Sequence, residues 1–291
     1  MTVALTRRGP SRSAKRVSVR WSFLTNLPIA LAFAWGWALL AFVVGRVVRR
    51  HATIDVFWGA GFLVIYLECL RVAHAGYPIS HIGVPGPSFS HRYVVLVFVA
   101  LWGLRLSLYL ARRQRGAKED TRYVVIMKGA RGRHETLYAL RQIYGLQGLL
   151  LWFVSMPLQW IAFHENVDGL FVPGLCLVAI GTFFEATGDE QLRRFLADPA
   201  TRGTTMRRGL WRYTRHPNYF GDTVVWCGFY VVACSSGWGW LTILSPVAMI
   251  YLLTSLSGKP MLERKLTTTR AGYDEYVATT SSFVPRPPRT R

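Results

Sequence analysis

The stretch RYTRHPNYFGD, residues 212–222, stands directly before the apolar run TVVWCGFYVVAC, residues 223–234. It interleaves aromatic residues with hydrogen-bonding ones. An apolar run of this kind is typical of a membrane-spanning helix. Ionisable side chains at that depth are costly, and they usually face the inside of a helix bundle or a wet cavity. The stretch therefore predicts a polar site at one end of a membrane-embedded helix bundle.

The composition supports a polytopic membrane protein. About half of the 291 residues are apolar, and 11 are tryptophan, which is more than an ordinary soluble enzyme carries. No stretch between the apolar runs is long enough to bury a core of its own. We therefore expect an all-α bundle of seven transmembrane helices in one domain over residues 21–291, after a basic, flexible tail over residues 1–20. The expected spans, each with about 20 mostly apolar residues, are 21–45, 53–75, 93–111, 147–164, 169–188, 219–236 and 238–257.

The charge balance points to an anionic partner. Lys and Arg outnumber Asp and Glu by 35 to 15, which gives a formal net charge of +20. Nucleic acid is excluded as the partner, because the basic residues form short blocks between apolar runs and no nucleic-acid-binding motif is present. An anionic membrane face or an anionic ligand is left. The four cysteines lie in apolar stretches without metal-ligand spacing, so we expect no metal site.

The distribution of Lys and Arg predicts the orientation in the membrane. The segments 112–146, 189–218 and 258–291 are basic, whereas 164–168 is acidic and 235–239 is uncharged. We therefore expect the three basic segments on the cytoplasmic side, which puts the N-terminus outside. The basic N-terminal tail favours the opposite placement, and we follow the three later segments.

Polar side chains gather where these basic segments meet the spans. Glu185, Asp189 and Arg193 are spaced by four and share one helix face, and Arg105 and Arg112 share another. The alternative is a set of interfacial ion pairs that only anchor helix ends, and for the C-terminal segment an amphipathic surface helix. We expect instead a cytoplasm-facing cavity that binds a nucleotide-like cofactor through arginine forks, since no glycine-rich phosphate loop is present. The candidate cofactor residues are Arg105, Arg112, Glu119, Asp120, Arg122, Asp189, Arg193, Arg215, His216, Asn218, Tyr219, Asp222, Glu263, Tyr273 and Tyr276.

Several of these segments resemble a known family. GLWRYTRHPNYFGD (209–222) and GDEQLRRF (188–195) are similar to the C-terminal region of the steroid 5-alpha-reductase superfamily. An uncharacterised bacterial branch of it also shows DVFWGAGF, LWGLRL, RRQRGAKEDTRY and SSFVP, so the resemblance covers residues from about 50 to 285, with the reductase-like half at about 147–291. The His-Pro-Asn-Tyr core is less specific, because isoprenylcysteine carboxyl methyltransferases and phospholipid methyltransferases share a similar segment.

The resemblance implies NADPH in a cavity among seven helices, open to the cytosol, and a bacterial inner (cell) membrane location. It implies hydride transfer to a carbon–carbon double bond of a lipid or sterol-like substrate, with Arg105, Asp189, Arg193, Asn218, Tyr219 and Asp222 at matching positions.

The resemblance also leaves the proton donor open. Where the steroid enzymes have a tyrosine, this chain has Trp102, which cannot act as an acid. We expect Asp55 to supply the proton, with Glu68 and Tyr123 as further candidates. Asp55 would equally suit a helix cap at the start of the second span.

Two other functions stay open from the sequence. An S-adenosylmethionine-dependent methyltransferase would use the same His-Pro-Asn-Tyr segment to hold a cofactor without a pyrophosphate. A non-enzymatic lipid-binding membrane protein would bind no cofactor, and it leaves the clustered Asp, Arg and Tyr residues without a role. The many arginines in three connections favour NADPH.

Overall fold

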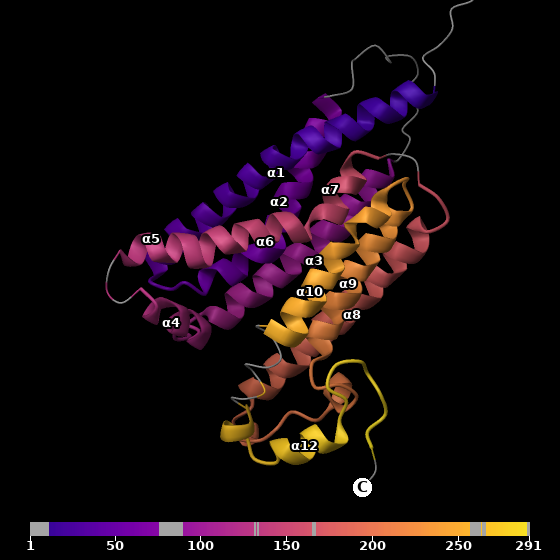
Figure 1. Cartoon of the computed structure of the whole chain (residues 1–291). Helices are drawn as coiled ribbons and strands as arrows, with labels where there is room; N and C mark the ends of the chain where they lie inside the picture. Colours follow the sequence, from indigo (N-terminus) through magenta and orange to yellow (C-terminus); the bar gives the residue numbers. More distant parts are fainter. Residues whose placement is uncertain are drawn as a thin grey trace, which may run out of the picture.

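The structure is a computed structural model that describes residues 12–75, 90–130, 132, 134–164, 167–256, 263 and 266–289, with side chains for 23–74 and for the later ranges. These residues form helices and no strand, and the long helices pack side by side (Figure 1). The α-helices are α1 Arg12–Val48, α2 Thr53–Ala75, α3 His91–Gln114, α4 Thr121–Lys128, α5 Glu135–Ala139, α6 Leu146–Val154, α7 Met156–Ala162, α8 Phe171–Ala197, α9 Pro217–Cys234, α10 Leu244–Tyr251 and α12 Tyr273–Thr279. Short π turns (Leu140–Gly145, Leu252–Leu256) and 3-10 turns (Pro199–Thr201, Gly209–Arg212, Gly239–Ile243) join or extend them.

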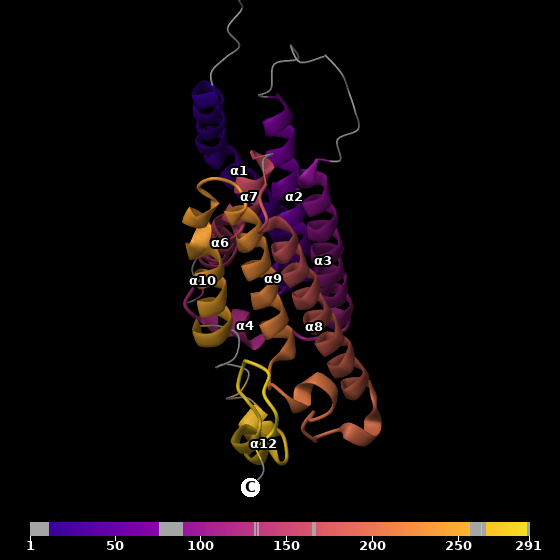
Figure 2. The same cartoon turned by 90° about the vertical axis from the view of Figure 1, so that its right-hand side faces the viewer.

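Several helices are suited to cross a membrane. By length and composition, five stretches of the described residues qualify, and the bent pair Glu135–Val154 and Met156–Ala162 makes a sixth if it is one span. The helix α9 is not among them, because Asn218 and Asp222 make its first two turns polar, although it lies between α8 and α10 (Figures 1 and 2). The all-helical membrane bundle is thus confirmed, whereas the exact number of spans is not.

The helix limits differ from the sequence expectation at several points. The fourth apolar segment begins at Glu135 rather than 147, because Tyr144 is buried and packs edge-on against Phe42 of α1 at 5.2 Å. It then bends by 50° between Val154 and Met156, where Pro157 cannot donate a backbone hydrogen bond. The expected connection 112–146 is therefore shorter and mostly helical. α8 continues to Ala197, and α1 begins at Arg12, inside the expected tail 1–20, of which residues 1–11 lie outside the described residues.

Small residues set the distance between α8 and α9. A Cβ atom added to Gly181 of α8 would lie 2.6 Å from both the Gly221 carbonyl oxygen and the Val225 amide nitrogen of α9. Only glycine permits such close backbone approach, which is a common device of membrane helix pairs. The contact brings Asp189 of α8 next to Asn218 of α9, so that the Asn218 Nδ2 atom lies 3.2 Å from the Asp189 Oδ1 atom.

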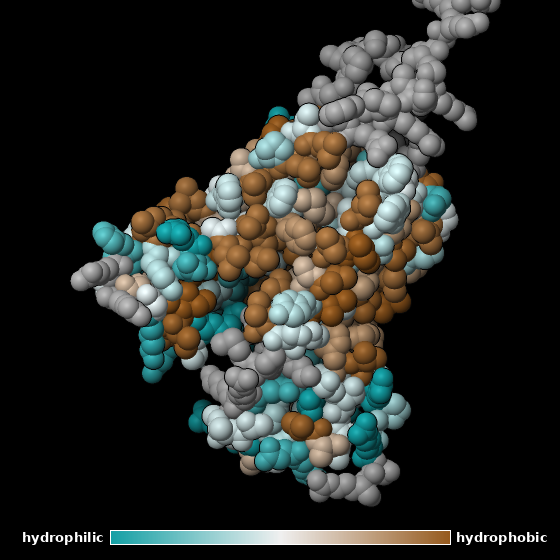
Figure 3. Space-filling model, viewed as in Figure 1, coloured by the Kyte–Doolittle hydropathy of each residue, from teal (hydrophilic) through white to brown (hydrophobic). Residues whose placement is uncertain are grey.

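The basic segments meet at one end of the bundle. The α1–α2 turn, α4 and its flanking residues, the α8–α9 connection and the C-terminal segment all lie at the same end of the bundle in Figure 1, and Figure 2 shows the last three of these there as well. We call this the basic end. Figure 3 shows hydrophilic side chains around α4, α5 and the C-terminal segment, and hydrophobic ones over the long helices. The three segments that the sequence predicts on one side of the membrane therefore do share one end.

Candidate functional site

A buried ionic cluster links α3, α8 and α9. The Arg105 guanidinium contacts the Glu185 carboxylate at 2.7 Å and the Asp189 carboxylate at 2.9 Å. The Trp102 indole donates to Glu185 at 2.7 Å, and the Asn218 amide donates to Asp189 at 3.2 Å. The two acidic side chains are only 4% exposed, and the arginine side chain is 24% exposed. We call these five residues the Arg105 cluster.

The local sequence explains how the cluster forms. Glu185 and Asp189 are four residues apart on α8, so their side chains lie on one face, as do those of Trp102 and Arg105 on α3. Asn218 comes from the first turn of α9. Buried charges are tolerated when they are paired and hydrogen-bonded, which is the state of both carboxylates here.

Asp222 lies one turn further along α9, beside the cluster but outside its ion pairs. Its side chain is within electrostatic range of Arg105, Glu185 and Asp189, and the residue is 9% exposed. Among the described residues, no Lys, Arg or His nitrogen lies within 4.0 Å of its carboxyl group. The Trp226 indole is close enough to interact with it, but neither the buried Asp222 Oδ1 nor the Trp226 Nε1 makes a hydrogen bond to the described residues.

A second cluster joins α2, α4 and α6. The Arg122 Nη2 atom contacts the Asp55 carboxylate at 2.7 Å, and the Tyr123 hydroxyl donates to the same carboxylate at 2.6 Å. Asp120 caps α4 by accepting from the Arg122 amide at 2.8 Å and pairs with its guanidinium at 3.1 Å. The Gln147 amide donates to the Tyr123 hydroxyl at 3.1 Å. We call these five residues the Arg122 cluster.

The role of Asp55 in this cluster is that of an acceptor. Its two oxygens accept from Arg122 and from Tyr123. Asp55 does not serve as the cap at the start of α2, which is the alternative to a role as proton donor; another residue binds the backbone there. Glu119 accepts from the two backbone amides that precede α2, at 2.5 and 3.0 Å. Asp55 therefore links α2 to α4, and Glu119 accepts the backbone hydrogen bonds at the N-terminal end of α2.

The ionisation of the α4 residues follows from these contacts. Burial lowers the pKa of Arg122, but the charge of Asp55 and the hydrogen bond to Asp120 outweigh it and raise that pKa above its usual value. Burial raises the pKa of Asp120, yet the hydrogen bonds from Arg122 bring it below its usual value. Burial, together with the Asp55 charge, raises the pKa of Tyr123 well above its usual range. Arg122 and Asp120 are therefore charged and Tyr123 is neutral near neutral pH.

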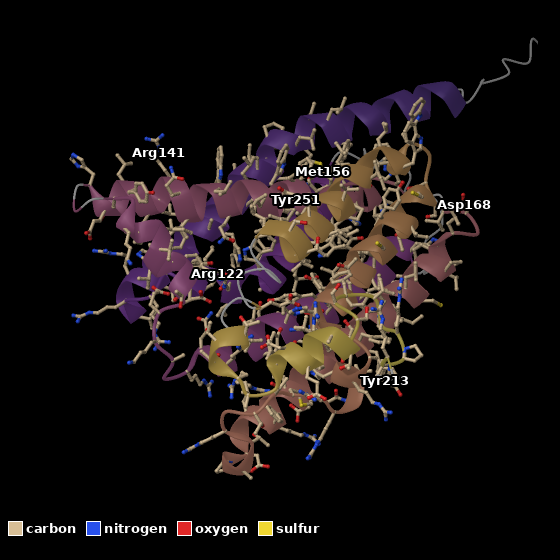
Figure 4. The ribbon with its side chains drawn as sticks, turned by 60° about the horizontal axis from the view of Figure 1, so that its bottom comes forward. Arg122, Arg141, Met156, Asp168, Tyr213 and Tyr251 are labelled. Atoms are coloured by element: carbon tan, nitrogen blue, oxygen red, sulfur yellow. The ribbon has the colours of Figure 1, made fainter. Side chains whose placement is uncertain are left out.

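Tyr219 lies between the two clusters. It is half-buried and within electrostatic range of Asp189 on one side and of Asp55 and Arg122 on the other. Figure 4 shows Arg122 turned toward the middle of this end of the bundle, whereas Arg141 points outward. The two clusters and Tyr219 thus form one polar region at the basic end.

The other expected residues near α9 bind one another. Arg215 Nε and His216 Nε2 contact the same Glu263 oxygen, at 3.0 and 2.9 Å. The Tyr276 hydroxyl donates to the Trp211 carbonyl at 2.5 Å. These contacts fasten the C-terminal segment to the chain that leads into α9. Burial and the negative charge of Glu263 raise the pKa of Tyr273, which packs against Tyr276, to about 12.

Three expected residues are not brought to the polar region. Glu68 lies thirteen residues along α2 from Asp55, about 20 Å at 1.5 Å per residue, where the Asn26 amide donates to it at 3.4 Å. The Arg193 side chain is 54% exposed and pairs with Glu190 at 2.6 Å. Arg112 is exposed at the end of α3.

Two surface cavities lie at the basic end. The larger, of about 510 Å³, borders the Arg122 cluster and is lined by His51, Glu119, Tyr123, Val124, Met127, Lys128, Gly132 and Glu135. The smaller, of about 290 Å³, lies between the end of α8 and residues 198–209. No group of three or more His, Cys, Asp or Glu side chains in the described ranges is arranged to hold a metal ion.

Sequence reasoning did not include three of the central residues among its site candidates. Glu185 has a visible signal, since it precedes Asp189 by four residues inside an apolar helix. Gln147 is a polar residue in the apolar run LQGLLLWFV, and such residues in spans usually make interhelical contacts. Trp102 shows no such signal, because only the fold reveals that its N–H group meets Glu185.

Comparison with known proteins gives one match. No curated protein and no solved structure matches the chain. A family model described as "Protein of unknown function (DUF1295)" matches residues 41–280. Because the match covers most of the chain, this helical membrane protein belongs to the DUF1295 family.

Proposed function

We propose that the protein is a membrane-embedded, NADPH-dependent reductase of a carbon–carbon double bond in a lipid or sterol-like substrate. The observation that carries the proposal is the Arg105 cluster. It sets Asp189 of α8 and Asn218, in the first turn of α9, side by side at the basic end and next to Tyr219. The motif segments that resemble the reductase superfamily supply these residues.

The residues present suit the chemistry of NADPH. A dinucleotide offers phosphates, ribose hydroxyls and a carboxamide. Outside the polar region, on the turn of α8 that follows Asp189, Arg193 and Arg194 share the single carboxylate of Glu190, at 2.6 Å each. Guanidinium N–H groups are therefore left over for the phosphates of a cofactor that extends beyond the Arg105 cluster. Asp189 accepts and Asn218 both donates and accepts, which matches hydroxyl and carboxamide groups. The basic end would face the cytoplasm, where Lys and Arg concentrate in membrane proteins.

Bound NADPH would supply a hydride. The protein would contribute orientation and exclusion of water. Arg105 holds Asp189 rigidly through a charge-assisted contact of 2.9 Å, so Asp189 and Asn218 are positioned before the cofactor arrives. The surrounding apolar helices admit a lipid from the bilayer. The Trp102 N–H group is already committed to Glu185, so it supports the cluster and supplies no proton.

Thermal unfolding of the detergent-purified protein tests the proposal. NADPH should raise the melting temperature, because a ligand present at 100 times its dissociation constant stabilises the native state by about 2.7 kcal/mol. Asp189→Asn should weaken this effect, since Asp189 belongs to the Arg105 cluster. The matched control is Asp198→Asn, at the exposed end of the same helix, which should keep the NADPH effect.

Turnover completes the test. Oxidation of NADPH should depend on added unsaturated lipid and should vanish in Asp189→Asn. Stabilisation by S-adenosylmethionine without stabilisation by NADPH would replace the proposal with a methyltransferase. No stabilisation by either cofactor would favour a lipid-binding protein.

A further inference from the structure

Three carboxyl groups, those of Glu185, Asp189 and Asp222, lie near the Arg105 guanidinium where α8 packs against the start of α9. Arg105 contacts Glu185 and Asp189 directly, and each of them accepts a further hydrogen bond, from Trp102 or Asn218. Asp222 is the third carboxyl group of this region, and it receives none of these contacts. Of these three acids, it is therefore the one without an ion pair among the described residues.

The environment of Asp222 favours the neutral carboxyl group. Arg105 of α3 is the cation in electrostatic range, and it is already paired with the two acids of α8. Those acids, Glu185 and Asp189, repel a further negative charge. On α9 itself the neighbour is the uncharged indole of Trp226. A buried carboxylate without an ion-pair partner is costly, and two nearby carboxylates add to that cost, so the group retains its proton.

Asp222 also lies between the polar cluster and the aromatic part of the bundle. One turn toward the polar end is Asn218 of the Arg105 cluster. One turn toward the bundle interior is Trp226, whose ring lies 5.6 Å from that of Trp102 and 4.5 Å from that of Phe62. The Asp222 carboxyl group therefore separates the ionic cluster from an aromatic, water-poor interior.

We propose that Asp222 holds a proton in the resting protein and donates it to the substrate carbon in the reduction. This inference rests on the proposed function. Bound NADPH would supply the hydride for a C–H bond at one carbon of the double bond and would leave as NADP⁺. The electron pair of the double bond takes the Asp222 proton at the neighbouring carbon, and the O–H electrons stay on Asp222 as carboxylate. A proton from water then restores the acid.

The other candidate acids are engaged in a different way. Both oxygens of Asp55 accept hydrogen bonds, and the Tyr123 proton is donated to Asp55. Glu68 is at the opposite end of α2 from Asp55. Asp222 is thus the carboxyl group at the Arg105 cluster that has no ion pair within the described part of the chain, and its buried Oδ1 accepts no hydrogen bond there.

Infrared spectroscopy of the resting protein tests the protonation without turnover. At a pH well above the usual range of carboxyl pKa values, exposed acids are ionised, and the C=O band of a neutral carboxyl group should persist. Asp222→Asn should remove that band. Asp274→Asn, which changes an exposed acid at the start of α12, should leave it. Absence of the band from the wild-type protein, or its persistence in Asp222→Asn, would overturn the proposal.

Turnover tests the donation. Asp222→Asn should keep the NADPH-dependent rise in melting temperature and lose turnover by about 100-fold or more, the usual effect of removing a general acid. Asp222→Glu should restore part of the rate. Unchanged turnover in Asp222→Asn, or the loss of turnover in Asp55→Asn alone, would disprove the donor role. If NADPH does not bind the wild-type protein, the proposed function fails together with the donor role, while the infrared band still reports the stored proton.

Discussion

Replacing Arg105 with methionine should destabilise the protein strongly. The Arg105 side chain is the cation that contacts Glu185 and Asp189, whose side chains are each 4% exposed. Removing one partner of a buried ion pair leaves an uncompensated charge and typically costs about 3–5 kcal/mol. We expect a loss in this range in the free energy of unfolding, because Arg105 serves two carboxylates. The loss should shrink as the pH falls, since protons then neutralise the abandoned acids.

The comparison that isolates this effect is a triple variant. Arg105→Met combined with Glu185→Gln and Asp189→Asn removes the charges together and keeps the shapes, so most of the lost stability should return. Equilibrium unfolding in mixed micelles, followed by tryptophan fluorescence, gives the three free energies. If Arg105→Met is as stable as the wild type, or if the triple variant is no more stable than Arg105→Met, the ion pairs do not hold α3 to α8 as described.

Two further predictions concern packing and pH. Gly181→Leu should lower the free energy of unfolding by about 1–3 kcal/mol or more through overpacking against α9. Gly36→Ala, at a site with no atom within 4 Å of the added carbon, should be neutral or slightly stabilising. Equal unfolding curves for the two variants would refute the close contact. Because the pKa of Tyr273 is raised to about 12, its neutral form favours the folded state, so its contribution is complete below the ordinary value of about 10 and is lost as the pH rises from there to about 12. Other tyrosines titrate in the same range, so Tyr273→Phe should reduce the phenolate absorbance that appears near pH 12 by one tyrosine. A reduction near the ordinary value of about 10 instead would contradict the burial of the C-terminal segment.

The sequence predicts the helices better than it predicts their contacts. Apolar length alone indicates the membrane helices, and the polar residues at the start of α9 indicate a site. Arg105, Asp189 and Asn218 could be grouped, because charges at membrane depth must meet a partner. Which partner each charge meets depends on which helices are neighbours. Arg193 therefore pairs with Glu190 on its own helix, and Arg215 with Glu263 of the C-terminal segment, although the sequence suggested a shared cavity.

The bend between α6 and α7 shows a similar limit. Hydropathy indicates an apolar segment there but not its direction, and Pro157 gives only the position of the break. The burial of Tyr144 against α1 extends the helix at its other end, and that packing follows from the tertiary structure.

The glycine contact between α8 and α9 also fixes how the two helices are aligned along their axes. Gly181 is one turn before Glu185, and Gly221 directly precedes Asp222. The number of residues between the glycine contact and each acid therefore sets where that acid lies along its helix. One residue inserted between Gly181 and Glu185 would turn both α8 acids by about 100° and shift them by about 1.5 Å. They would then no longer face Arg105. The length of this short stretch of α8 is therefore under as strict a constraint as the identity of the charged residues, and natural variants should change its residue types without changing its number of residues.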